Sequence, residues 1–322
     1  MLVDMSVDAL KEYQGRNPRP ADFDEYWDAA IKEMKSLDPQ VELIPSDFQV
    51  PCAECFDMYY TGMGGARIHA KLLRPKNQSK PGPAVVQLHG YSGSSGDWND
   101  KLSYVASGFT VAVIDVRGQG GRSEDVGGHK GNTLHGQIIR GLDGKPEDLL
   151  FRSIYLDCAQ LTYLVMGMDN VDATKVGVFG GSQGGGLTLA TIALCPEVNR
   201  AAPVYPFLTD YRRTWEMDLA VNAYSELKEY FRYFDPRHER EEEIFTRLGY
   251  IDVQFLMPRV KCPVLMFTGL MDTICPPSTQ FAAYNKITSE KKVIFYPDFG
   301  HEHLPGSGDF TYRFMLEMLD KE

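Results

Sequence analysis

From residue 84 onward, the sequence alternates short apolar runs rich in β-branched residues with stretches of helical periodicity. Strands that are covered by helices on both faces need continuous apolar runs of this kind. An alternation of such strands with helices predicts a doubly wound, mostly parallel α/β sheet. The runs that we expect to form strands lie at residues 84–89, 110–114, 175–179, 201–205, 263–267 and 292–296.

Three segments depart from this alternation, and we interpret all of them as parts of a single domain over residues 1–322. Residues 1–83 contain an amphipathic helical repeat and then two strand-like runs around a Gly-rich turn, which predicts a helix and a hairpin. Residues 118–145 are Gly-rich and poor in strand patterns, so we expect a long surface loop with a role in binding or assembly. Residues 209–259 are aromatic, charged and helical in pattern, which predicts a helical insertion before the fifth core strand.

Composition and charge exclude several classes of function. The formal net charge is −11, so the chain lacks the basic surface that nucleic acids and anionic membranes attract. No apolar run approaches the length of a membrane-spanning helix, and residues 1–8 carry acidic groups where a secretory signal would be apolar. We therefore expect a cytoplasmic protein with reduced cysteines, in which the Cys52–Cys55 pair is incidental.

A candidate nucleophile lies in the pentapeptide Gly180-Gly181-Ser182-Gln183-Gly184, which fits the pattern G-x-S-x-G. The pentapeptide directly follows a predicted strand and precedes an apolar helical stretch. A serine in this strand–turn–helix setting is typical of a nucleophile elbow, in which small neighbours relieve crowding in the strained turn. The pattern predicts that Ser182 is the nucleophile of an α/β-hydrolase fold.

A serine nucleophile needs a base, and the base needs a carboxylate to orient it. In this fold the chain order is serine, acid, histidine, and Asp272 and His301 follow the last two predicted strands in that order. All three side chains are then expected at the carboxyl edge of the sheet. Asp298 is a weaker alternative for the acid, and the neighbouring Glu302 and His303 lack the spacing of a metal site.

Acyl transfer also needs two N–H donors for the oxyanion of the tetrahedral intermediate. One is expected from the residue after the nucleophile, here Gln183. The loop after the first core strand supplies the second, and in His89-Gly90-Tyr91-Ser92-Gly93 the candidate is the N–H of Tyr91.

Several motifs together resemble carbohydrate esterase family 7, which comprises acetyl xylan esterases and cephalosporin C deacetylases. They are Arg117-Gly118-Gln119, Gly180-Gly181-Ser182-Gln183-Gly184 and His301-Glu302, with matching flanks at residues 89–93 and 272–277. The resemblance extends from about Tyr13 to the C-terminus. It implies hydrolysis of acetyl esters of small molecules, including acetylated xylo-oligosaccharides and cephalosporin C.

The same resemblance implies a cytoplasmic homohexamer whose active sites face an internal cavity, with residues 118–145 as an interface extension. It also implies that Arg117, Gly118, Gln119 and Glu302 support the site, with Arg117 and Gln119 holding the loops around the nucleophile. Direct binding of substrate by Arg117 is the less favoured interpretation.

The residues predict a serine esterase mechanism that needs neither metal nor organic cofactor. Ser182 attacks the acetyl carbonyl, His301 takes its proton, and Asp272 fixes the imidazole. Two alternatives stay open: a serine peptidase or aminopeptidase on the same scaffold, and a non-catalytic binding protein of this fold. A comparison of acetate esters with aminoacyl amides as substrates distinguishes an esterase from a peptidase. Labelling by an organophosphonate distinguishes an enzyme from a binding protein.

Overall fold

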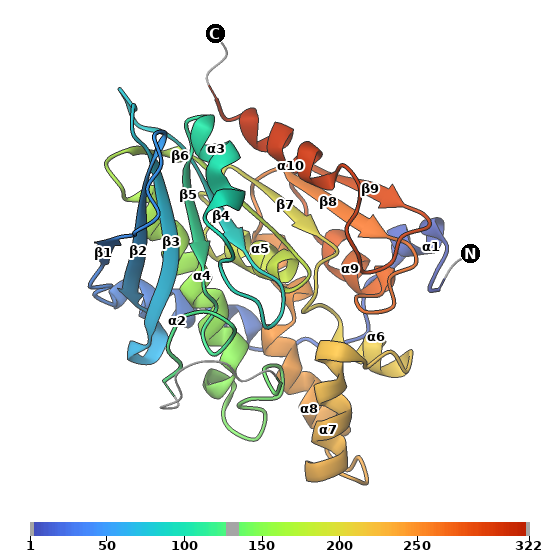
Figure 1. Cartoon of the computed structure of the whole chain (residues 1–322). Coiled ribbons are helices and arrows are strands. Elements are labelled where there is room, and N and C mark those ends of the chain that lie inside the picture. Colours follow the sequence, from blue (N-terminus) through green and yellow to red (C-terminus); the bar gives the residue numbers. More distant parts are fainter. Residues whose placement is uncertain (1–2, 127–134, 320–322) are drawn as a thin grey trace.

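The computed structural model describes residues 3–126 and 135–319, and within them the strands form one nine-stranded mixed sheet (Figure 1). The strand order is β1-β2-β3-β5-β4-β6-β7-β8-β9. The first pairs, β1 with β2, β2 with β3 and β3 with β5, are antiparallel, and every pair from β5 to β9 is parallel. The strands are β1 Glu42–Pro45, β2 Ala53–Thr61, β3 Arg67–Pro75, β4 Gly82–Leu88, β5 Thr110–Ile114, β6 Val171–Gly181, β7 Arg200–Val204, β8 Val264–Gly269 and β9 Lys291–Tyr296.

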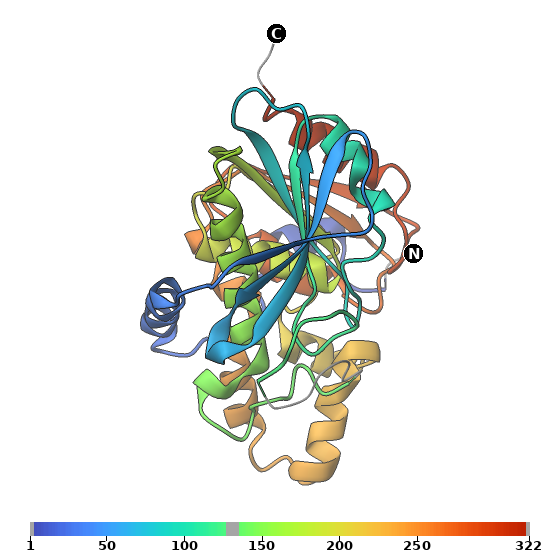
Figure 2. The ribbon, with the colours of Figure 1, turned by 60° about the vertical axis from the view of Figure 1, so that its left-hand side comes forward.

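Helices cover both faces of this sheet (Figures 1 and 2). The α-helices are α1 Val7–Glu12, α2 Phe23–Ser36, α3 Leu102–Ala106, α4 Leu150–Met166, α5 Gln183–Leu194, α6 Tyr211–Glu216, α7 Ser225–Phe234, α8 Glu241–Leu248, α9 Pro277–Tyr284 and α10 Ser307–Leu316. Short 3-10 helices occupy Met63–Gly65, Asn99–Lys101, Pro146–Asp148, Asn222–Tyr224, Gly249–Ile251, Val253–Phe255 and Met257–Arg259.

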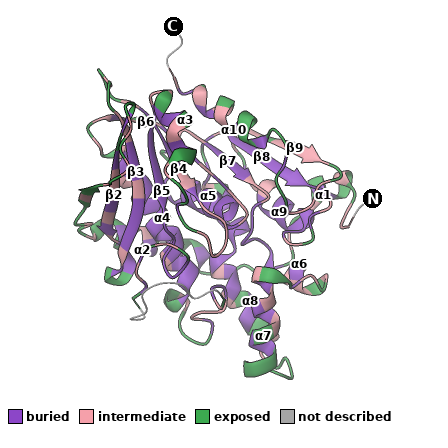
Figure 3. Cartoon of the chain, in the orientation of Figure 1, coloured by how far each residue is buried: buried purple, intermediate pink, exposed green. Residues whose placement is uncertain are grey.

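The two faces of the sheet bury separate apolar clusters, and in Figure 3 the central strands and α5 are largely purple, the colour of buried residues. On one face, Val86 and Val178 lie in a cluster with α2, α4 and α5. On the other face, Val85 lies in a cluster with side chains of α3 and α10, among them Tyr104 and Met315. Because both faces are covered, the central strands are continuously apolar, as the sequence runs predicted.

The fold class expected from the sequence is confirmed, including the mostly parallel sheet and the hairpin of β2 and β3. Strand β1 was not predicted. It has four residues, ends in Pro45 and lies exposed at the edge of the sheet, so it lacks the apolar pattern that burial imposes. The expected N-terminal helical stretch is divided into α1 and α2 by a segment that contains Pro18 and Pro20.

The expectation that residues 118–145 form a surface loop is wrong in part. Residues 127–134 of this segment lie outside the described residues. In the part that is described, Gln119, Gln137 and Ile138 are buried. The loop therefore runs beneath the carboxyl edge of the sheet and contributes to its packing.

The long connection between β7 and β8 carries α6, α7 and α8, and it extends beyond the edge of the sheet (Figure 1). Helix α7 packs onto the rest of the fold through buried residues such as Leu227 and Phe231. Across residues 3–126 and 135–319, no helix is long and apolar enough to cross a membrane.

The strand order fixes where the candidate site lies. Strand β4 has β5 on one side and β6 on the other, so the chain reverses its direction of winding at β4. In open α/β sheets, ligands bind in the crevice at the carboxyl ends of the strands where this reversal occurs. The loop after β4 contains Gly90 and Tyr91, and the turn after β6 contains Ser182.

Candidate active site

Ser182 occupies a strained turn between β6 and α5. Its backbone has φ 57° and ψ −119°, a region that residues with a side chain rarely adopt. The glycines on either side are required by close packing: a Cβ at Gly180 would lie 2.4 Å, and one at Gly184 2.0 Å, from the carbonyl oxygen of Leu88. The turn thus holds the serine hydroxyl out from the end of the sheet, as a nucleophile elbow does.

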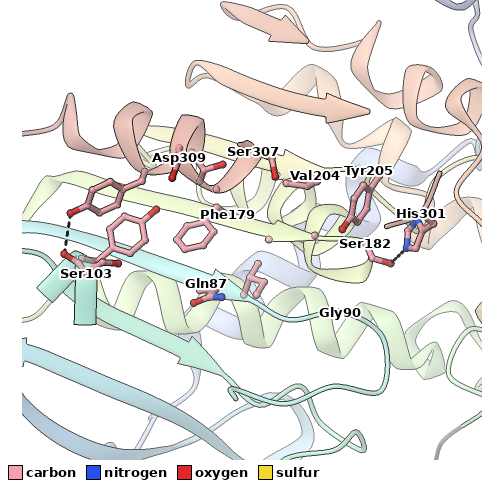
Figure 4. Close-up of a pocket in the computed structure, with 17 residues that line it drawn as sticks. Gln87, Gly90, Ser103, Phe179, Ser182, Val204, Tyr205, His301, Ser307 and Asp309 are labelled. Carbon is pink, nitrogen blue, oxygen red and sulfur yellow. Dashed lines mark hydrogen bonds between the residues drawn. The ribbon is translucent and has the colours of Figure 1, made fainter. Parts of the chain in front are cut away.

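Ser182, His301 and Asp272 form one hydrogen-bonded chain (Figure 4). The Ser182 Oγ lies 2.9 Å from Nε2 of His301. Nδ1 of the same ring lies 2.8 Å from Oδ2 of Asp272. A carboxylate can only accept, so Nδ1–H donates to Asp272 and leaves Nε2 free to accept the serine proton.

Asp272 is fully buried in the turn after β8. Its Oδ1 accepts hydrogen bonds from the backbone N–H groups of Ile274 and Cys275, each at 2.8 Å. These two bonds fix the carboxylate so that Oδ2 faces the imidazole. Asp298, the alternative acid, is exposed on the turn after β9.

The two expected oxyanion donors lie at the start of α5 and on the loop after β4. Gln183 is the first residue of α5, where backbone N–H groups lack partners within the helix. Tyr91 lies on the loop after β4, and its phenol donates a hydrogen bond to Glu226 of α7. The ring of Tyr91 also packs edge-on against Phe207, with 5.9 Å between the ring centroids. The backbone of the Tyr91 loop is therefore anchored from the side of the helical insertion.

Gln119 and Gln183 join the two most specific sequence motifs through their side chains. Nε2 of Gln119 donates to Oε1 of Gln183 at 2.7 Å, and Nε2 of Gln183 donates back to Oε1 of Gln119 at 2.9 Å. Both side chains are buried. This pair ties the loop after β5 to the residue that follows the nucleophile.

Arg117 lies away from the reacting groups, in the interior of the protein. Its guanidinium makes a bidentate ion pair with Asp157 of α4, at 2.6 and 2.8 Å, and donates to the carbonyl of Met63 at 2.9 Å. Gly118, at φ 66°, turns the chain from Arg117 toward Gln119. Arg117 thus anchors the loop that carries Gln119.

Glu302 supports the histidine loop from its exposed side. Its Oε1 accepts a hydrogen bond from the backbone N–H of Gly300 at 3.0 Å, which closes the turn that presents His301. His303 is also exposed. Among residues 3–126 and 135–319, no group of three or more His, Cys, Asp or Glu side chains is placed to hold a metal ion.

Two residues of the site were missed by the sequence reasoning. Tyr205 follows β7, and its ring packs against the imidazole of His301, with 4.5 Å between the centroids. Its position at the carboxyl end of the strand predicted at residues 201–205 was the signal that was available. Glu226 is buried in α7, accepts from Tyr91 and also accepts from the backbone N–H of Ile138 at 2.6 Å. Burial raises the pKa of Glu226, and no sequence pattern distinguished it from its charged neighbours.

Asp115 and His69 also hold loops of the site in place, and no sequence pattern indicated this role. Asp115 follows β5 and accepts from the backbone N–H groups of Ser95 and Arg122, at 2.6 and 3.0 Å. Buried His69 lies between Asp115 and Asp57, with ring nitrogens 2.6 and 2.8 Å from their carboxylate oxygens. These contacts hold the loops after β4 and β5 against each other.

A cavity of about 800 Å³ opens onto the nucleophile and extends along the sheet beneath α3 and α10 (Figure 4). Ser182, His301 and Tyr205 lie at one end, and Ser103 lies at the other. Gln87 of β4 lines the cavity between the two ends. The site therefore combines a serine hydrogen-bonded to a histidine with room for a ligand of substantial size.

Known proteins with similar sequences and folds match almost the whole of this chain. The family model described as acetyl xylan esterase (AXE1) matches residues 1–318. The crystal structure of acetyl xylan esterase 1 from Thermoanaerobacterium sp. JW/SL YS485 is 59% identical, with a TM-score of 0.95, covering 98% of this chain and 100% of that chain. An acetyl xylan esterase structure from Paenibacillus sp. R4 is 36% identical, with a TM-score of 0.91 and the same coverage of 98% and 100%.

A curated relative, acetyl esterase Axe7A from Xylanibacter ruminicola, is 26% identical over 309 residues, which is 92% of this chain. The chain spans 66% of the length of that relative. The expected resemblance to a family of acetyl esterases is thus confirmed over almost the whole chain.

Proposed function

The chain belongs to the acetyl xylan esterase family, and on that premise we propose that it is a serine esterase that hydrolyses acetyl esters of small, hydroxyl-rich molecules. The observation that carries this proposal is the hydrogen-bonded chain from Ser182 through His301 to Asp272. The two links measure 2.9 and 2.8 Å, which lies within the hydrogen-bond reach that a nucleophile and its base need.

The first half of the reaction acylates the enzyme. His301 accepts the proton of Ser182 at Nε2 as the serine oxygen attacks the acetyl carbonyl carbon. Asp272 holds the ring in the tautomer with hydrogen at Nδ1 and stabilises the imidazolium that forms. The N–H groups of Gln183 and Tyr91 donate to the oxyanion of the tetrahedral intermediate. His301 then gives its proton to the alcohol oxygen, and the alcohol leaves.

The second half releases acetate. Water replaces the alcohol, and His301 removes one proton from it as the water oxygen attacks the acetyl carbon. The tetrahedral intermediate collapses, the Ser182 oxygen takes the proton back from His301, and acetate departs. No step needs a group that the chain does not supply.

The family resemblance suggests the particular substrates and the oligomeric state. Acetylated xylo-oligosaccharides are the substrates suggested by the names of the structural relatives. Cephalosporin C carries the same kind of acetyl ester and is a second substrate that the family resemblance suggests. The resemblance also suggests a homohexamer, with residues 118–145 at its interfaces. The free thiols at all six cysteine positions are compatible with a reducing cytoplasm.

Replacement of the nucleophile tests the proposal. Ser182→Ala should reduce hydrolysis of 4-nitrophenyl acetate to the background rate while the thermal unfolding midpoint stays near that of the wild type. Ser36→Ala, on an exposed residue at the end of α2, serves as a matched control and should retain activity. Near-full activity of Ser182→Ala would show that the nucleophile lies elsewhere.

A further inference from the structure

Gln87 is an unusual residue for its place in the sheet. It lies near the end of the central strand β4, paired in register with Val113 of β5 and with Phe179 of β6. The preceding residue on this face of β4, Val85, is apolar and belongs to the core beneath α3 and α10. A polar side chain at such a position is costly unless its hydrogen-bonding groups are satisfied.

The amide of Gln87 has no hydrogen-bond partner in the described part of the chain, and it lines the cavity that leads to Ser182 (Figure 4). The phenol of Tyr104 on α3 is in the same situation: it lines the cavity, and none of the described residues hydrogen-bonds to it. Burial raises the pKa of Tyr104, so its hydroxyl stays protonated and can donate. Two neutral hydrogen-bonding groups therefore face one cavity without hydrogen-bond partners among the described residues.

Aromatic rings form the walls around these two groups. Tyr104 lies 5.4 Å from Phe179 and 4.9 Å from Tyr312, measured between ring centroids. Tyr312 of α10 closes the far end, since its hydroxyl donates to the carbonyl of Ser103 at 3.1 Å. Asp309 of α10 also lines the cavity (Figure 4). Aromatic faces with a few polar groups suit the apolar faces and the hydroxyl groups of a sugar ring.

The position of the cavity decides which part of an ester it accepts. An acetyl group has two carbon atoms, whereas the cavity has a volume of about 800 Å³, so the acyl group leaves almost all of it unfilled. The cavity also opens directly onto His301, which must reach the oxygen of the leaving alcohol. The alcohol part of the ester is therefore the part that fits.

We infer that the cavity beneath α3 and α10 binds the alcohol part of the ester, and that Gln87 and Tyr104 select neutral, hydroxyl-rich alcohols of the size of a short oligosaccharide. This inference rests on the proposed esterase function. It assigns a specificity role to two residues that take no part in bond breaking.

Steady-state kinetics on two acetates test the inference. Gln87→Leu and Tyr104→Phe should each raise KM for acetylated xylobiose about fivefold, the effect expected for the loss of one neutral hydrogen bond. Both variants should hydrolyse 4-nitrophenyl acetate with a kcat/KM within about twofold of the wild type, because its alcohol part has no hydroxyl groups to bind. Gln14→Leu makes the same change at an exposed residue and should leave the kinetics on both substrates unchanged.

Two results would overturn the inference. One is an unchanged KM for acetylated xylobiose in both variants. The other is faster hydrolysis of 4-nitrophenyl octanoate by Gln87→Leu, which would place the acyl chain in the cavity. If Gln87→Leu does not fold, Tyr104→Phe decides, because it removes one oxygen to which none of the described residues hydrogen-bonds. A wild-type protein inactive on both acetates would instead refute the esterase function itself.

Discussion

The side-chain amides of Gln119 and Gln183 hydrogen-bond to each other in both directions, at 2.7 and 2.9 Å, in the interior beneath the nucleophile. Gln119 belongs to the loop after β5 and Gln183 begins α5, immediately after Ser182. A reciprocal pair satisfies one donor and one acceptor on each amide, so it fixes both side chains in a single arrangement. The pair therefore holds a remote loop against the N–H group that is expected to stabilise the oxyanion.

Loss of the Gln119–Gln183 hydrogen bonds should lower both the stability of the fold and kcat. Gln119→Leu leaves the Gln183 amide buried without its main partner, so the free energy of unfolding should fall by about 1–3 kcal/mol. The kcat for 4-nitrophenyl acetate should fall more than KM changes, because the oxyanion donor is displaced. Urea unfolding and steady-state kinetics provide the two readouts. In the double variant with Gln183→Leu, stability should partly recover; additive losses would argue against a coupled pair.

The buried ion pair of Arg117 and Asp157 should matter for stability and not for substrate binding. Arg117→Met leaves the Asp157 carboxylate buried without its partner, which should cost about 3–5 kcal/mol of unfolding free energy. The KM for 4-nitrophenyl acetate should stay near the wild-type value, because Arg117 does not line the cavity. Adding Asp157→Leu should restore part of the stability. A large rise in KM with unchanged stability would instead favour direct substrate binding by Arg117.

Replacement of Asp272 by asparagine should lower kcat strongly, whereas the same replacement of Asp298 should not. In Asp272→Asn, the side-chain oxygen keeps the two backbone N–H bonds and the amide then donates toward His301, which enforces the wrong tautomer. The kcat should fall about 10⁴-fold. Asp298→Asn, on an exposed turn, should retain wild-type kinetics. Comparable losses in the two variants would leave the identity of the acid open between them.

Asp252 should make stability depend on pH. Burial, and next the charge of Asp210, raise the pKa of Asp252 from an ordinary 3.8 to about 7. The folded state thus holds this proton where the unfolded state has lost it. The stabilising contribution is complete below pH 3.8 and is lost as pH rises through about 7.

Urea unfolding between pH 4 and pH 8 measures this effect, since each unit of pKa shift corresponds to about 1.4 kcal/mol. Asp252→Asn has no proton to lose, so its unfolding free energy should fall less across this range than that of the wild type. Equal changes in the two proteins would show that Asp252 is ionised in the folded state throughout.

The sequence predicted the sheet and the proximity of Ser182, His301 and Asp272 because both leave local patterns. Buried parallel strands must be continuously apolar, and Ser182, Asp272 and His301 each follow such a strand. The supporting contacts leave no such pattern. Glu226 is one acid among several in α7, and its burial against Tyr91 depends on how the insertion packs. Gln87 lies within an apolar run of the sequence, and only the cavity beside it shows the importance of an amide that has no hydrogen-bond partner among the described residues.

The direct test of Ser182 as the activated nucleophile is covalent labelling with an organophosphonate, followed by peptide mass spectrometry. We predict one label per chain, on the peptide that contains Ser182, with a rate that falls sharply in His301→Ala and Asp272→Asn. Labelling at another serine, or none in an enzyme that still hydrolyses 4-nitrophenyl acetate, would contradict the assignment of Ser182.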